Sequence, residues 1–187
     1  MKMRNILLIT GTVLALLLLA YPFFSSNAQK NERSSKTLLQ SSALEAIGRN
    51  AAANSFYDKM QQGETSKNYN WSLSKAFYSP SRSPGKKDGK ETTTMFLKEE
   101  PVKVQVSITE YYSATDARFP LTLMTEQGIA KACKGDLCGD EEQKSYGNSG
   151  FISLQFKKDN YFVYITCDSE ETAMRFAGYA LKAITER

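Results

Sequence analysis

The chain has 187 residues, of which 41% are apolar, and its 24 Lys and Arg residues exceed its 20 Asp and Glu residues by four. This length fits one domain or two small ones. The charge surplus is too small for the basic face that nucleic-acid binding requires. Because the chain contains no histidine, it excludes a Ser-His-Asp or Cys-His relay and an HExxH zinc helix.

The first 28 residues have the pattern of an export signal. A short positive start with Lys2 and Arg4 precedes an almost uncharged run from Ile6 to Phe24, and Ala28 ends a stretch of small residues suited to cleavage. We expect cleavage after Ala28 and a periplasmic, secreted or envelope-associated protein. The alternative is an uncleaved membrane anchor, because about 20 apolar residues span a hydrocarbon core of about 30 Å.

Residues 29–91 predict a helix, an aromatic segment and a linker. After a polar start, an apolar stripe over residues 37–62 predicts a helix, with Gly63 as its stop signal. Trp71 lies in a run that alternates aromatic and polar residues, which predicts a short strand or an aromatic flap. Residues 79–94 contain Ser, Pro, Gly and Lys in a pattern typical of turns and linkers.

Residues 92–187 predict a domain of two hairpins, each followed by a helix. Strict alternation over residues 102–109 predicts a strand, which we expect to pair with residues 95–97 through Glu99-Glu100-Pro101. Ser113 is a helix N-cap in this pattern, and Pro120 should kink or restart the helix that follows.

The second predicted hairpin spans residues 151–167. A two-residue turn at Lys158-Asp159 would pair Phe156 with Tyr161 and Leu154 with Val163. The predicted inner face has six apolar side chains: Ile152, Leu154, Phe156, Tyr161, Val163 and Ile165. The opposite face carries Ser153, Gln155, Phe162 and Tyr164. The closing helix would bury one stripe: Ala173, Phe176, Ala177, Ala180, Leu181 and Ile184.

These elements predict an α+β fold. The two ββα units form a four-stranded antiparallel sheet with both helices on one face, and the preceding segment forms an N-terminal helix. We expect that helix or the Trp71 segment to cover the other face, over Phe162 and Tyr164.

The three cysteines suit an oxidising compartment. Cys133 and Cys138 flank four residues that include Gly135, so we predict a disulfide bond between them. A closed zinc site needs four ligands, which three cysteines without histidine do not supply, so we expect no metal. Cys167 ends the last predicted strand on its inner face. We interpret it as a small buried side chain, with a reactive nucleophile as the alternative.

Carboxylates are the remaining candidates for acid-base chemistry. Adjacent acids occur at Glu99-Glu100 and Asp140-Glu141-Glu142, in predicted turns where water solvates such groups. We therefore predict a protein with no enzymatic activity and no cofactor. A histidine-free thiol or carboxylate enzyme stays an alternative.

Residues 95–187 resemble C-terminal modules of exported bacterial proteins of unassigned function. The resemblance rests on Gly139-Asp140-Glu141, Tyr146-Gly147, Phe156 to Asn160, the strand from Tyr161 to Ile165, and Arg175-Phe176-Ala177 in the closing helix. It implies a bacterial envelope setting and a non-catalytic module, and it transfers no catalytic residue.

Large aromatic side chains on a sheet face predict a binding surface. Phe162 and Tyr164, together with Trp71, stand where a solvated sheet would carry polar residues, so we predict a surface for an unknown protein or apolar ligand. Ordinary core packing is the alternative for each of them. A structural or accessory role through an uncleaved N-terminal anchor is the second hypothesis.

Overall fold

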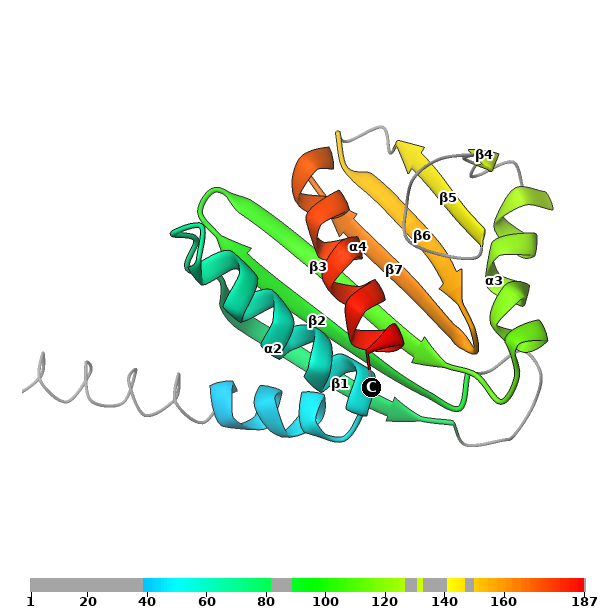
Figure 1. Ribbon diagram of the computed structural model, residues 1–187, viewed down its shortest axis with the longest axis horizontal. Coiled ribbons are helices and arrows are strands. Elements are labelled where there is room, and N and C mark those ends of the chain that lie inside the picture. Colours follow the sequence, from blue (N-terminus) through cyan, green and yellow to red (C-terminus); the bar gives the residue numbers. More distant parts are fainter. Residues whose placement is uncertain (1–38, 82–88, 127–130, 133–140, 147–149, 187) are drawn as a thin grey trace, which may run out of the picture. The chain divides into compact units, whose positions relative to one another are not determined.

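An antiparallel sheet flanked by helices forms the protein (Figure 1). The computed structural model describes residues 39–81, 89–126, 131–132, 141–146 and 150–186. Within these ranges the sheet has seven strands, in the order β1-β2-β3-β7-β6-β5-β4. The strands are β1 Ser72–Pro80, β2 Glu91–Glu99, β3 Val102–Glu110, β4 Lys131–Ala132, β5 Glu141–Tyr146, β6 Ile152–Lys158 and β7 Tyr161–Cys167. The predicted α+β class is confirmed, and the four predicted strands are the central β2, β3, β7 and β6.

The helical segments differ from the prediction at the N-terminal end. Residues 39–48 are helical, and α2 spans Ala51–Thr65. The single helix predicted over residues 37–62 is therefore wrong, because the Asn50 side chain accepts a hydrogen bond from the Ala53 amide at 2.9 Å and starts a new helix. Helix α3 spans Ala114–Glu126 and α4 spans Glu170–Thr185.

The predicted N-cap at Ser113 is confirmed, and Ser169 caps the last helix in the same way. The Ser113 hydroxyl accepts from the Asp116 amide at 3.1 Å, and the Ser169 hydroxyl accepts from the Thr172 amide at 3.3 Å. Each bond satisfies an amide that has no partner inside its own helix. Helix α3 continues through Pro120 and does not restart there.

Helices α2 and α4 pack side by side on one face of the sheet (Figure 1). The main core lies between them and the inward side chains of the central strands, and its largest members are fully buried: Ile47, Phe56, Met60, Met95, Leu97, Ile108, Leu154, Phe156, Ile165 and Phe176. Burial of each such side chain contributes about 1.5–3 kcal/mol. We call this side of the sheet the inner face and the opposite side the outer face.

Helix α3 lies on the outer face, so the prediction of both helices on one face is wrong. A separate apolar cluster joins α3 to the sheet through Ala117, Leu121, Tyr111 and Phe162. Neighbouring residues on a strand point to opposite faces, and Val163 belongs to the inner cluster while Phe162 belongs to the outer one.

The register of the β6–β7 hairpin also differs from the prediction. Lys158 pairs with Tyr161, so the turn is Asp159-Asn160, and Asp159 has φ 51°. Asp tolerates this left-handed conformation better than most residues. Leu154 pairs with Ile165, two residues from its predicted partner, and a shift of two leaves every side chain on its predicted face.

Several strands, or parts of strands, were not predicted from the sequence. The predicted linker over residues 79–94 contains the start of β2. Thr93 there is buried, and the hydroxyls of Thr92 and Thr94 form hydrogen bonds with hydroxyls on β3. Strands β4 and β5 lack apolar alternation altogether. Strand β1 contains a bulge between Leu73 and Lys75.

Gln40–Arg187 forms one compact unit. The predicted division into residues 29–91 and 92–187 stays a prediction. The predicted export signal, residues 1–28, lies outside the described residues. The described ranges contain no helix with the length and apolar character needed to cross a membrane.

Gly63 generates a stability prediction because it lies against α4 and does not end α2. A Cβ at this position would overlap the phenol ring of Tyr179. We expect Gly63→Ala to destabilise the protein by about 1–3 kcal/mol, the usual cost of overpacking. Urea unfolding followed by circular dichroism measures this change.

Gly178→Ala is the matched control. Gly178 lies inside α4, and a Cβ there has no neighbour within 4 Å. We expect the free energy of unfolding of this variant to rise by about 0.5–1 kcal/mol, because alanine has a better helix propensity than glycine. Equal gains in both variants would show that Gly63 is not needed for close packing.

Candidate functional site

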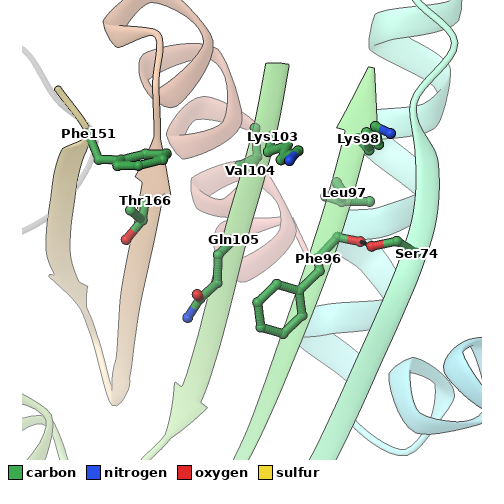
Figure 2. Close-up of a pocket in the computed structure, with 9 residues that line it drawn as sticks. All are labelled: Ser74, Phe96, Leu97, Lys98, Lys103, Val104, Gln105, Phe151 and Thr166. Carbon is green, nitrogen blue, oxygen red and sulfur yellow. Dashed lines mark hydrogen bonds between the residues drawn. The ribbon is translucent and has the colours of Figure 1, made fainter. Parts of the chain in front are cut away.

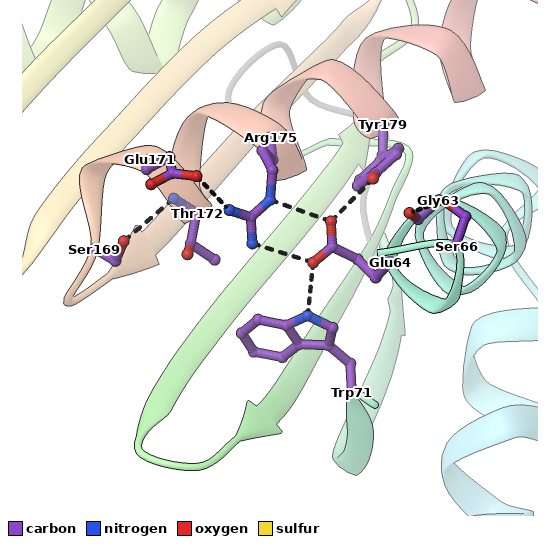
Figure 3. A network of polar contacts seen from close by, with 9 residues as sticks. All are labelled: Gly63, Glu64, Ser66, Trp71, Ser169, Glu171, Thr172, Arg175 and Tyr179. Carbon is purple, nitrogen blue, oxygen red and sulfur yellow. Dashed lines mark hydrogen bonds and ion pairs between the residues drawn. The ribbon is translucent and has the colours of Figure 1, made fainter. Parts of the chain in front are cut away.

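Glu64 is a carboxylate in the protein interior, only 1% exposed, with four hydrogen-bond donors around it (Figure 3). The Trp71 indole N–H donates to Oε2 at 2.9 Å, and the Tyr179 hydroxyl donates to Oε1 at 2.9 Å. Arg175 donates from Nε to Oε1 at 3.2 Å and from Nη2 to Oε2 at 3.1 Å. This bidentate arrangement fixes the guanidinium and the carboxylate in one geometry.

The electrostatics of this network favour the ionised carboxylate. Burial raises the pKa of Glu64, but hydrogen bonds from Arg175, Trp71 and Tyr179 together outweigh burial and hold the pKa below its ordinary value. Burial and the hydrogen bond to Glu64 raise the pKa of Tyr179 to about 12. Because every donor already binds Glu64, the network is a structural tie between α2, α4 and the start of β1.

Cys167 has the properties of a buried structural thiol. Its side chain is fully buried in the main core, and the Ser169 amide donates to Sγ at 3.3 Å. Burial raises the pKa of the Cys167 thiol to about 11, so the nucleophilic thiolate is scarce at neutral pH. Cys133 and Cys138 lie outside the described residues, and the disulfide between them stays a prediction.

The three predicted binding residues do not form one surface. Trp71 is 4% exposed and lies in the inner core, where its ring meets Phe176 edge-on at a centroid distance of 4.9 Å. Phe162 is 9% exposed beneath α3, and Tyr164 packs partly buried against the same cluster. The structure therefore puts Trp71 on one face of the sheet and the other two on the opposite face, with core roles for Trp71 and Phe162.

The outer face beside α3 is organised in rows that run across the strands. One row contains Lys75, Phe96, Gln105, Thr166 and Ser153, each paired with the next in the sheet register. The next row toward the β2–β3 turn contains the directly opposed pair Lys98 and Lys103. In the other direction, two hydrogen bonds between hydroxyl oxygens link β2 to β3. They join Thr94 to Ser107 at 2.9 Å and Thr92 to Thr109 at 3.0 Å.

An open hollow of about 380 Å³ occupies this part of the outer face (Figure 2). Its side-chain lining combines aromatic rings, amino groups, an amide and hydroxyls: Phe96, Phe151, Lys98, Lys103, Gln105, Ser74 and Thr166. Phe151 is 42% exposed and Phe77 is 53% exposed. The ring of Phe77 contacts the Phe96 ring edge-on, with 6.1 Å between the ring centroids. No carboxylate lines the hollow among the described residues, so its polar groups are mainly donors.

The sequence contained a weak signal for this hollow. Met95-Phe96-Leu97 places three apolar residues in succession on a strand, so one of them must point away from the inner core. Phe96 is that residue, because Met95 and Leu97 are buried in the inner face. The alternating pattern predicted the strand, but the role of Phe96 on its second face was not predicted.

Comparisons with known proteins assign no family to this chain. No known protein family and no curated protein matches it in sequence. The solved structures that it resembles include two distant ones. The extracellular domain of PknH from Mycobacterium tuberculosis has a TM-score of 0.45 and 11% identity, covering 68% of this chain and 91% of that domain. A GTP binding regulator from Thermotoga maritima has a TM-score of 0.47 and 13% identity, covering 72% of this chain and 90% of that one. Neither likeness is close enough to assign a function.

Glu64→Gln tests the structural role of the buried network. The substitution leaves Arg175 without its charged partner, and we expect a loss of about 3 kcal/mol in the free energy of unfolding at neutral pH. Because folding lowers the pKa of Glu64, its contribution is present above the unfolded value of about 4.3 and is lost as the pH falls through the folded value. The deficit of the variant should therefore shrink below about pH 4 in urea titrations.

Glu171→Gln is the matched control for this prediction. Glu171 also forms an ion pair with Arg175, at 3.0 Å, but its side chain is 84% exposed. Exposed pairs of this kind contribute at most about 0.5 kcal/mol. A deficit of equal size in both variants, or a deficit for Glu64→Gln that is constant with pH, would contradict the role of burial.

Cys167 should resist alkylation in the folded protein. With its thiol buried and its pKa near 11, we expect iodoacetamide to leave Cys167 unmodified at neutral pH and to modify it after unfolding in urea. Peptide mapping by mass spectrometry distinguishes it from Cys133 and Cys138. Rapid modification of the native protein at Cys167 would revive the thiol-enzyme alternative.

Proposed function

We propose that this protein is an extracytoplasmic binding module that takes an apolar or aromatic ligand in the hollow on the outer face of its sheet. The observation that carries the proposal is Phe96, a half-buried aromatic ring on the outer face that lines the hollow with Phe151. A volume of about 380 Å³ lies within the usual range of ligand pockets, about 300–1,000 Å³. The extracytoplasmic location rests on the export pattern of residues 1–28.

The layout of the two sheet faces supports a binding role. Helices α2 and α4 supply the inner face with a core, and α3 covers the outer face near Phe162. The remaining outer face keeps aromatic side chains at its surface, including Phe77 and Phe151. Exposed aromatic groups at a hollow with a few polar partners are typical of ligand sites.

Non-catalytic binding is favoured over a thiol or carboxylate enzyme. Cys167 is buried under the inner face, and Glu64 is fully occupied by its four donors. The hollow has no carboxylate or thiol among its described lining residues. Its amino, amide and hydroxyl groups suit recognition through hydrogen bonds.

Phe96→Thr tests the hollow with the neutral fluorescent probe N-phenyl-1-naphthylamine. Threonine keeps the strand propensity of the position but removes the ring. We expect the probe to bind the wild-type full chain and to bind the variant about tenfold more weakly, equivalent to about 1.4 kcal/mol. Both chains carry residues 6–24, so probe binding to that apolar run cancels in the comparison. Circular dichroism verifies that the variant is folded.

Phe77→Thr is the control for this experiment. Phe77 is 53% exposed, against 42% for Phe151, and it is not among the residues that line the hollow. Loss of the Phe77 ring should lower the affinity for the probe at most about twofold, a change typical of a residue that does not contact the ligand. If both variants lose affinity equally, the probe binds exposed aromatic rings in general and the hollow is not a site.

A further inference from the structure

We infer that the ligand of the hollow is a small amphipathic molecule with one acidic group, which Lys98 and Lys103 bind while its apolar part contacts Phe96. This inference rests on the proposed function and adds the charge of the ligand. It follows from the sheet register, the charges at the end of the hollow, and the spacing between the charged and aromatic rows.

The sheet register places two like charges next to each other. Lys98 of β2 pairs directly with Lys103 of β3, and both side chains lie on the outer face at the edge of the hollow (Figure 2). Directly opposed residues have Cβ atoms about 5 Å apart, and like charges in this position destabilise a sheet. An anion between the two amino groups would convert this repulsion into attraction.

Only part of this positive charge is neutralised within the described residues. Lys98 forms an ion pair with Glu100 in the β2–β3 turn, and the Glu100 side chain is 72% exposed. Two ammonium groups and one carboxylate leave a net charge of +1. A single acidic group on the ligand would therefore complete the charge balance at this end of the hollow.

The remaining polar lining also prefers an acceptor. Gln105 of β3 lies in the row next to the lysines, and it pairs with Thr166 of the neighbouring strand β7. The described lining residues place no carboxylate in the hollow, so a cationic ligand would find ammonium groups and no counter-charge. An anionic ligand would find both charge and donors.

The spacing of the rows sets the form of the ligand. Phe96 lies two residues along β2 from Lys98, which corresponds to about 7 Å in an antiparallel strand. Because lysine side chains are long and flexible, the acidic group should lie within about 7 Å of the rings that contact Phe96. The site is a concave hollow of about 380 Å³, which suits a single small molecule better than the flat surface of a bilayer.

The test compares two probes that differ by one acidic group. N-phenyl-1-naphthylamine is neutral, and 8-anilino-1-naphthalenesulfonate has the same rings with a sulfonate. We expect the full chain to bind the anionic probe more tightly. The double variant Lys98→Gln with Lys103→Gln should lose about fivefold to tenfold in anionic-probe affinity, as for a partly exposed charged contact, and keep its neutral-probe affinity.

Salt and a lysine variant outside the hollow provide the controls. The preference for the anionic probe should fall as salt rises from about 0.01 to 0.15 M, because the Debye length shortens from about 30 to 8 Å. Lys67→Gln removes an exposed lysine in the turn after α2, which is not among the residues that line the hollow. It should leave both affinities unchanged. An equal loss in the Lys67 variant would show a net-charge effect and overturn the inference.

The remaining outcomes separate the inference from the proposed function. If the neutral probe binds through Phe96 and the anionic probe binds no more tightly, the acidic-ligand inference fails and the binding module survives. If neither probe binds, both fail. If instead the protein co-sediments with vesicles of phosphatidylcholine and phosphatidylglycerol through Lys98 and Lys103 while neither probe saturates, the site is a membrane surface and the inference is overturned.

Discussion

The burial of one carboxylate constrains much of this fold. Glu64 loses nearly all contact with water, and a charge in that position is tolerated only if protein groups replace the hydration shell. Arg175 and Tyr179 on α4 and Trp71 before β1 supply those groups, so α2, α4 and the sheet must adopt one relative position. The close approach of Gly63 to Tyr179 belongs to the same junction. The inner face is thus fixed by these hydrogen bonds as well as by apolar burial.

The two faces of the sheet have different chemistry because adjacent residues on each strand point in opposite directions. Met95 and Leu97 enter the core, whereas Phe96 between them lines the hollow. Among the described residues, helix α3 covers the part of the outer face near β6 and β7. A ligand on the uncovered part would contact side chains held by a sheet that α2 and α4 support from behind. Binding there requires no rearrangement of the core.

Local patterns predicted local structure well, and long-range placement was the main source of error. The apolar stripe identified α4, because a 3.6-residue period is encoded within a few residues. The faces of β6 and β7 were also correct, although a turn at Asp159-Asn160 altered the register. Nothing local shows which face of a sheet a helix will cover, so α3 was misplaced and Phe162 with it. Gly63 was misread for the same reason, since its neighbour Tyr179 lies far away in sequence.

Strand β1 stands at one end of the sheet order and combines three features that discourage further strand pairing. The bulge between Leu73 and Lys75 disturbs the regular spacing of its backbone groups, Lys75 adds a charge, and Pro80 lacks an amide donor at its end. An edge of this kind is a poor template for a strand from a second molecule. The protein can therefore carry exposed aromatic residues on one face of the sheet with less risk of ordered aggregation through the edge strand β1.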